Sequence, residues 1–259
     1  MHFPVSNAFL FVSSKHVLLF WSFKGNIFHF ACYLFIFSFS CIFMSLCLYV
    51  FGVEVVVLLK FLAPTWDEIY FLTFKVARMI LEDGVNFDVI VGIARGGWIV
   101  ARMMSDLLSI KKVASITVEF YSDIGEKMEE PVVSQPISID VQAKRVLLCD
   151  DVADSGHSLR VAINHLKDNG VTSLKVATLH LKPWSVVTPD YYGEVTDAWI
   201  IYPWELFESV ESLSRKFEAK GWTRDEIERF LLNIPIPLKY LDPLLKWREM
   251  FMLAWRGGR

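Results

Sequence analysis

The chain has 259 residues, which is enough for one domain with a substantial core together with extensions. Its formal net charge of −3 at pH 7 creates no overall positive field, so the composition argues against a nucleic-acid-binding protein. Hydrophobic residues make up 54% of the chain, which exceeds the roughly 45–50% of typical globular proteins.

The excess of apolar residues is concentrated near the N-terminus, where residues 25–53 contain no Asp, Glu, Lys or Arg. About 20 apolar residues can span the hydrocarbon core of a bilayer, so the pattern predicts a transmembrane helix at about residues 27–53. The alternative is a mis-assigned start, with translation beginning at Met44 or near Val53. We favour the second interpretation and expect a cytoplasmic protein. The first would give a protein anchored in a membrane by a single N-terminal helix.

The rest of the chain alternates between helical and strand patterns. Thr65 and Glu68 form a potential capping box for a helix over residues 65–83, and Gly84 follows its last residue. Short runs rich in apolar residues predict buried strands over residues 87–94, 111–121, 144–152, 173–181 and 196–204. Further helices are expected over residues 98–110 and 158–170. Residues 122–143 are polar and contain prolines, which predicts a long loop or a flexible β-excursion.

This alternation predicts an α/β fold, in which helices cover both faces of a parallel sheet. Ligands bind such sheets at the carboxyl ends of the strands. Four segments directly follow or end predicted strands, namely "ARGG" (94–97), "CDDVADSGHS" (149–158), "LKPW" (181–184) and "AWIIYPW" (198–204). We therefore expect these four segments to meet at one edge of the sheet.

The pattern changes after the last predicted strand, where we expect accessory helices that pack on the domain or mediate self-association. Thr223 and Glu226 form a second potential capping box, for a helix over residues 221–233, and residues 242–256 are amphipathic. Cys149 is the one cysteine after the apolar N-terminal segment, so neither a disulfide nor a thiolate metal site is expected in that part of the chain.

The segment "VLLCDDVADSGHSL", residues 146–159, carries the clearest chemical signal. Residues 153–158 lie between a predicted strand and a predicted helix, where small residues and a glycine allow successive backbone N–H groups to point at one anion. Asp150 and Asp151 would repel that anion unless they bind sugar hydroxyls or a Mg²⁺ ion shared with phosphates. A phosphate-binding loop beside two such acids predicts a site for a 5-phosphoribosyl group.

This segment resembles the signature of the type I phosphoribosyltransferases, which bind phosphoribosyl pyrophosphate (PRPP). The similarity extends over about residues 64–208 and is greatest to the xanthine-guanine branch, which has "RGG", then the signature, then Lys-Pro, then "W-I-x-x-P-W-[DE]". The resemblance implies the type I fold, with a central, mostly parallel sheet flanked by helices and a small hood. It also implies three parts: an N-terminal segment (1–60), a phosphoribosyltransferase domain (61–208) and a C-terminal helical extension (209–259).

The resemblance also implies roles for individual residues. The PRPP-binding residues would be Arg95, Gly96, Gly97, Asp150, Asp151, Ala153, Asp154, Ser155, Gly156, His157 and Ser158. Within this set, Arg95 and the two glycines would hold the pyrophosphate, and His157 would contribute its backbone N–H to the 5-phosphate site. Asp151 would bind Mg²⁺, the expected cofactor. Asp154 would be the catalytic residue, as a general acid or base or as a hydrogen-bond partner of the purine N7.

The expected base-binding residues are Lys182, Trp199 and Ile200. A lysine can donate to an exocyclic oxygen but offers no acceptor to an exocyclic amino group, which favours 6-oxopurines. The implied activity is purine salvage, by transfer of 5-phosphoribosyl from PRPP to guanine, xanthine or hypoxanthine. A regulatory protein that binds PRPP or a nucleotide on the same fold is the alternative. We expect a homodimer or homotetramer without nucleic-acid partners, and packing roles for Trp184, Tyr202 and Trp204.

Overall fold

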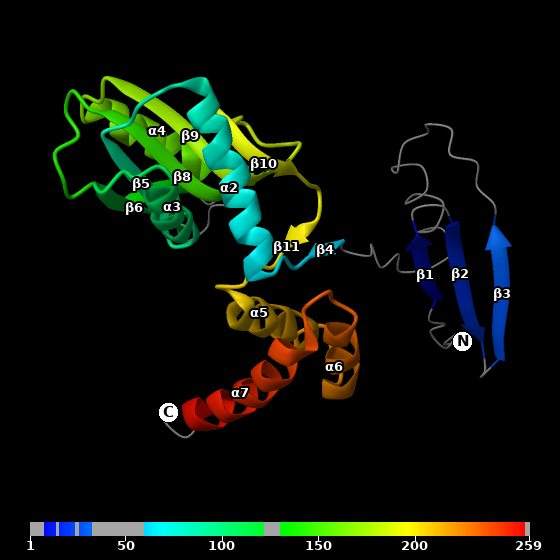
Figure 1. The fold of residues 1–259 in the computed structure, drawn as a ribbon. Helices are drawn as coiled ribbons and strands as arrows, with labels where there is room; N and C mark the ends of the chain where they lie inside the picture. The colour runs from blue at the N-terminus through cyan, green and yellow to red at the C-terminus, as the bar shows by residue number, and fades with distance from the viewer. Residues whose placement is uncertain (1–7, 14–15, 24–25, 33–59, 122–129, 257–259) are drawn as a thin grey trace. The chain divides into compact units, whose positions relative to one another are not determined.

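The computed structural model describes residues 8–13, 16–23, 26–32, 60–121 and 130–256. The chain divides into two compact units, residues 1–60 and residues 61–259 (Figure 1).

In the N-terminal unit, the described residues form an antiparallel sheet in the order β1-β2-β3. Its strands are β1 (Ala8–Ser13), β2 (His16–Phe23) and β3 (Asn26–Cys32). The beginning of the span expected at residues 27–53 is therefore a strand and not a helix, in keeping with the high β-propensity of its aromatic residues. The larger part of that span, residues 33–53, lies outside the described residues. No helix in the described ranges combines the length and apolarity needed to cross a membrane.

The second unit is built around a sheet whose described strands follow the order β10-β9-β8-β5-β6-β7. Its strands are β5 (Val89–Ala94), β6 (Val113–Tyr121), β7 (Glu130–Gln135), β8 (Arg145–Ala153), β9 (Ser173–Leu181) and β10 (Tyr191–Val195). All neighbouring pairs are parallel except β6 and β7. The predicted α/β fold with a mostly parallel sheet is thereby confirmed.

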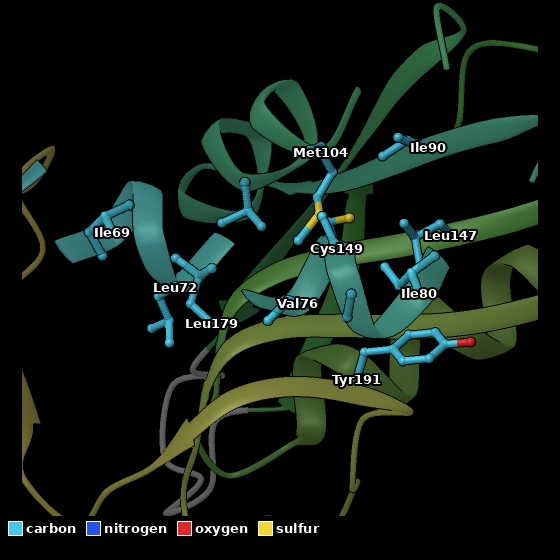
Figure 2. Close-up of a cluster of buried hydrophobic side chains, with 14 of the residues drawn as sticks. Ile69, Leu72, Val76, Ile80, Ile90, Met104, Leu147, Cys149, Leu179 and Tyr191 are labelled. Carbon is cyan, nitrogen blue, oxygen red and sulfur yellow. The ribbon is translucent and has the colours of Figure 1, made fainter. Parts of the chain in front are cut away.

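Helices cover both faces of this sheet (Figure 1). They are α2 (Trp66–Asp83) and α3 (Gly96–Leu107) on one face and α4 (His157–Asp168) on the other. Side chains alternate along β8: Leu147 and Cys149 belong to the core under α2 and α3, which Figure 2 shows, and Val146 and Leu148 belong to the core under α4. This two-sided burial explains why the strand is an uninterrupted apolar run that ends at the aspartates.

Two predictions about strands need correction. The strand expected over residues 196–204 is limited to β11 (Trp199–Ile200), which pairs with β4 (Phe61–Leu62) in a small separate sheet. The strand that pairs with β9 at one edge of the main sheet is instead β10, which the sequence pattern did not predict. The segment expected as a loop or β-excursion contains β7, which pairs antiparallel with β6, and residues 122–129 lie outside the described residues.

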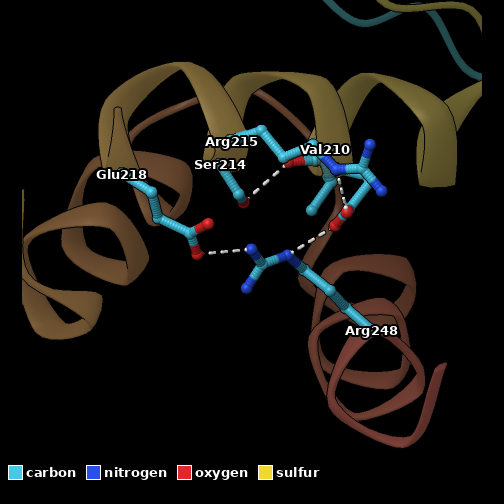
Figure 3. A network of polar contacts seen from close by, with 6 residues as sticks. Val210, Ser214, Arg215, Glu218 and Arg248 are labelled. Atoms are coloured by element: carbon cyan, nitrogen blue, oxygen red, sulfur yellow. Dashed lines mark hydrogen bonds and ion pairs between the residues drawn. The ribbon is translucent and has the colours of Figure 1, made fainter. Parts of the chain in front are cut away.

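The C-terminal helices form a cluster with its own apolar core, to which residues around the β4–β11 sheet contribute. They are α5 (Leu206–Glu218), α6 (Arg224–Leu232) and α7 (Leu238–Arg256). The predicted capping box of Thr223 and Glu226 is present at the start of α6. Arg248 of α7 donates to Glu211 at 2.7 Å and to Glu218 at 2.6 Å, joining α7 to α5 (Figure 3). The expected domain boundary at residue 208 falls inside α5, and treating the helices as a separate extension remains a prediction.

Candidate active site

Three of the four expected segments meet at the carboxyl edge of the main sheet. Strands β5, β8 and β9 are parallel neighbours, and their ends carry Arg95, the aspartates after Cys149, and Lys182 respectively. The fourth segment, residues 198–204, belongs partly to the small β4–β11 sheet. It reaches the same edge because the Lys182 ammonium donates to the Ala198 carbonyl oxygen.

Helix α3 begins directly against the two aspartates. It starts at Gly96, two residues earlier than predicted, so both glycines lie in its first turn. A Cβ on Gly97 would lie 2.5 Å from the Cys149 carbonyl oxygen and 2.8 Å from Asp150 Cα, and a Cβ on Gly96 would overlap the Asp151 carboxylate. The glycines are therefore required by the close approach of α3 to β8, and this contact places the first N–H groups of the helix beside the acids.

Arg95 precedes this helix, after a cis peptide bond with Ala94. Its side chain is 82% exposed, and its Nη2 lies 2.7 Å and 2.8 Å from the two carboxylate oxygens of Glu208 on α5. The guanidinium that was expected to bind pyrophosphate is therefore paired with the Glu208 carboxylate. This contact could not be predicted from the sequence, because Arg95 and Glu208 are 113 residues apart in the chain.

Three carboxyl groups at this edge, those of Asp150, Asp151 and Glu205, have raised pKa values. Burial, reinforced by the charge of Asp151, raises the pKa of Asp150 well above its usual value. Burial also raises the pKa of Asp151 to about 6, although a hydrogen bond from the Val152 N–H at 2.8 Å acts in the opposite direction. Burial and the charge of Asp151 raise the pKa of Glu205 to about 7. A cation bound here would relieve the repulsion among the three groups.

The residues at this edge fit Mg²⁺ as a cofactor that also binds a substrate. Carboxylate oxygens are the hard donors that Mg²⁺ prefers, and Mg²⁺ usually binds through one or two carboxylates while phosphates and waters complete its shell. Within the described residues no cluster of three or more His, Cys, Asp or Glu side chains is arranged to hold a metal. Asp151 and its neighbour Asp150 would therefore supply only part of the coordination shell.

A buried hydrogen-bonded chain fixes the fourth segment to the end of β8. The Tyr202 hydroxyl donates to the Asp151 carbonyl oxygen at 3.0 Å and lies 2.8 Å from His180 Nδ1. Burial lowers the pKa of His180 to about 4, so its ring is neutral and can donate from Nδ1 to the tyrosine oxygen. Trp204 stacks on Tyr202 with ring centroids 4.6 Å apart. The expected packing roles of Tyr202 and Trp204 agree with these contacts.

The expected phosphate-binding loop joins β8 to α4 as predicted. Gly156 immediately precedes α4 and has a left-handed backbone with φ 81°. The His157 N–H donates to Ser155 Oγ at 3.4 Å, a long hydrogen bond that an anion bound at the start of α4 could replace. A Cβ on Gly156 would lie 2.6 Å from Ser185 Oγ and 2.7 Å from the Val187 nitrogen. The glycine is thus required by the turn packed behind the loop as well as by its own backbone conformation.

The expected base-binding residues come from two places: Lys182 directly follows β9, and Trp199 and Ile200 form β11. Lys182 is only 6% exposed, and burial lowers the pKa of its ammonium. Trp199 is exposed, whereas Ile200 is buried. Trp184, for which packing was expected, is instead 55% exposed; its Nε1 lies 3.0 Å from Asp154 Oδ1, and the Lys182 ammonium lies 5.5 Å from its ring centroid. The packing role expected for Trp184 was therefore wrong.

The sequence analysis assigned no part in the site to three residues at this edge: Trp184, for which it expected packing, Glu205 and Glu208. Glu205 was visible as the last residue of the "W-I-x-x-P-W-[DE]" pattern, and Trp184 as the residue after Lys-Pro. Their positions in these patterns were the available signals. Glu208 had no comparable signal, because it lies outside every pattern identified above.

Comparison with known proteins agrees with this geometry. The model of the phosphoribosyl transferase domain family matches residues 65–214. Xanthine-guanine phosphoribosyltransferase of Gluconobacter oxydans is 28% identical over 142 residues, which cover 54% of this chain and 82% of that protein. The bifunctional protein PyrR of Ralstonia nicotianae is 33% identical over 111 residues, which cover 40% of this chain and 63% of that protein.

Two solved structures are similar in fold and sequence. The purine phosphoribosyltransferase of Pyrococcus horikoshii is 39% identical with a TM-score of 0.51, and the match covers 56% of this chain and 94% of that one. A hypothetical protein from Neisseria gonorrhoeae with bound ppGpp is 28% identical with a TM-score of 0.52, covering 57% and 90%. The family match spans more than half of the chain and contains every residue of the candidate site. The chain therefore belongs to the phosphoribosyltransferase family and is an enzyme of the type I fold.

Proposed function

We propose that the protein transfers the 5-phosphoribosyl group of PRPP to a 6-oxopurine base, giving a nucleoside monophosphate and pyrophosphate. The observation that carries this proposal is the position of Asp154. It lies within the loop that joins β8 to α4, three residues after Asp151, and its charge acts on the buried Lys182 that follows β9. In this arrangement the proposed phosphate, ribose and base sites would adjoin in the order in which those groups are joined in the product.

Each part of PRPP has a matching group at this edge. The 5-phosphate would bind the loop of residues 153–158 and the first turn of α4, where backbone N–H groups and the helix dipole favour an anion. Asp150 and Asp151 would accept hydrogen bonds from the ribose hydroxyls. The pyrophosphate would bind the first turn of α3 and the guanidinium of Arg95, whose planar donors suit phosphate oxygens. A Mg²⁺ ion held by Asp151 would screen the charge of the departing pyrophosphate.

In the proposed reaction, the bond between ribose C1 and the pyrophosphate oxygen breaks, and its electron pair leaves with pyrophosphate. A ring nitrogen of the purine forms the new bond on the opposite face of C1, and the purine gives up one proton. Asp154 would accept that proton, or a hydrogen bond from the purine N7, as positive charge develops on the base. The carboxylates of Asp150 and Asp151 would stabilise positive charge on the ribose in the transition state.

Base selection would depend on Lys182 and Trp199. The Lys182 ammonium is held by the Ala198 carbonyl and has further N–H groups for an exocyclic oxygen at purine position 6. The exposed indole of Trp199 can stack on the purine, and the Ile200 backbone lies beside it in β11. The Gluconobacter relative, a xanthine-guanine phosphoribosyltransferase, supports a 6-oxopurine, and the Pyrococcus relative, a purine phosphoribosyltransferase, supports a purine more generally.

A regulatory role is the second candidate. It is favoured by the similarity to the bifunctional protein PyrR and to the Neisseria protein with bound ppGpp. Such a protein would bind PRPP or a guanine nucleotide at the same edge without needing Lys182 or Asp154 for turnover. The presence of both residues, in contact with the same turn, favours the enzyme.

The two candidates can be separated with the full-length chain. Pyrophosphate release would be measured with PRPP and Mg²⁺ and, in turn, guanine, xanthine, hypoxanthine and adenine. We expect turnover with at least one 6-oxopurine and much less with adenine, and Asp154→Asn should reduce that turnover strongly. Preference for adenine would contradict the assignment of the base. Tight binding of PRPP without turnover of any base would instead support the regulatory candidate.

A further inference from the structure

The turn that follows β9 is attached to both neighbours of Asp154. The Lys182 N–H donates to the Ala153 carbonyl at 3.0 Å, and the Val186 N–H donates to the Ser155 carbonyl at 3.0 Å. Within the turn, the Ser185 N–H donates to the Lys182 carbonyl at 3.1 Å. The backbone on each side of Asp154 is therefore fixed to residues 182–187, and only its side chain remains free to change direction.

Trp184 lies in the middle of this turn and contacts that side chain. Its indole Nε1 donates to Asp154 Oδ1 at 3.0 Å. An indole N–H is a donor only, so the contact favours a carboxylate oxygen pointing toward the ring and leaves Oδ2 for another partner. The ring also lies 5.5 Å from the Lys182 ammonium, a distance at which a cation is attracted to the face of an indole. Trp184 thus contacts both the expected catalytic acid and the expected base-recognising lysine.

We propose that Trp184 is a positioning residue for the transfer reaction, which holds the Asp154 carboxylate so that Oδ2 faces the purine. This inference rests on the proposed function and adds a residue to it. The indole would act through Asp154 and would not itself touch the reacting atoms. Because Trp184 is 55% exposed, it contributes little to the core.

The hydrogen bond from Trp184 to Asp154 restricts the side-chain rotamers of the aspartate. An exposed aspartate after a strand can adopt several side-chain rotamers, and only some of them aim an oxygen at the base. A single hydrogen bond to a carboxylate is strong enough to select one of these rotamers before substrate arrives. The selection should affect the rate of the chemical step more than the binding of PRPP, whose phosphate groups are bound by the loop and helix termini.

The test compares Trp184→Phe with wild-type protein in steady-state kinetics with PRPP, Mg²⁺ and the best 6-oxopurine. The phenylalanine keeps an aromatic face for Lys182 and removes only the donor. We expect kcat to fall about fivefold, a value reduced for solvent exposure, with the KM for PRPP unchanged. Trp184→His, which retains a ring N–H, should recover part of the loss. In an Asp154→Asn background, Trp184→Phe should have little further effect, because the two residues act as one unit.

The matched control is Trp247→Phe, since Trp247 on α7 is equally exposed at 55% and lies in the C-terminal helices. It should leave kcat and KM unchanged. An unchanged kcat in Trp184→Phe, a rise in the KM for PRPP alone, or full additivity with Asp154→Asn would overturn the positioning role. Lack of turnover by wild-type protein with every base would instead refute the proposed function itself, so the two failures are distinguishable.

Discussion

The paired aspartates should make the free enzyme less stable than it could be, and Asp151→Asn tests this directly. Burial raises the pKa of Asp151 from 3.8 to about 6. Keeping this carboxyl ionised in the folded protein at pH 7 therefore costs on the order of 3 kcal/mol of unfolding free energy. Asparagine has nearly the same shape, carries no charge and can still accept the hydrogen bond from the Val152 N–H. The substitution should stabilise the ligand-free protein while abolishing most activity.

The effect of Asp151→Asn should depend on pH in a defined direction. Because the folded-state pKa lies above the unfolded value, wild type carries no penalty below about pH 3.8, and the penalty grows as the pH rises and is complete above about pH 6. For a unit of this size, on the order of 3 kcal/mol corresponds to a shift in Tm of roughly 6–12 °C. The variant and wild type should therefore melt together near pH 4 and diverge by pH 7.5.

The assay is thermal unfolding followed by tryptophan fluorescence, without PRPP or Mg²⁺, at both pH values. The exposed Asp106 of α3 provides a control, because Asp106→Asn removes a carboxylate that solvent already surrounds. It should change Tm little at either pH. If Asp151→Asn melts at or below the wild-type temperature at pH 7.5, the aspartate is not destabilised by burial and the electrostatic argument fails.

Three further substitutions test other contacts. Gly97→Ala should destabilise the protein by about 1–3 kcal/mol and weaken calorimetric binding of PRPP with Mg²⁺, because its Cβ would lie 2.5 Å from a backbone oxygen of β8; unchanged melting and binding would show that α3 can move. Glu208→Gln should lower the KM for PRPP by about two- to fivefold, since it releases Arg95 from an exposed ion pair; an unchanged or higher KM would exclude that competition. Arg248→Met should destabilise the protein by about 2 kcal/mol in urea unfolding, because the nearly buried Glu211 carboxylate would keep only its exposed partner Arg215. An unchanged urea midpoint would show that Arg215 alone is enough to neutralise Glu211.

Much of the fold could be predicted because its signals are local. The apolar runs of β5, β8 and β9 follow from burial on both faces, and the capping boxes at Thr65 and Thr223 mark helix starts within four residues. The strand expected over residues 196–204 failed for the opposite reason. Its backbone pairs with β4 over two residues only, although Ile200 and Tyr202 pack into the core of the main sheet and Ile201 packs among the C-terminal helices, so its apolar residues reflect burial and not strand pairing.

The sequence by itself determined the strand, loop and helix around Asp150 and Asp154, because that unit is encoded in fourteen consecutive residues. Tertiary structure alone decided which distant groups meet it. Gly96 and Gly97 are needed because α3 packs against β8 with no room for a Cβ, and Trp184 contacts Asp154 because the turn after β9 is hydrogen-bonded across the loop. Such contacts depend on how separate elements pack, and packing is a property of the assembled sheet that no single segment specifies.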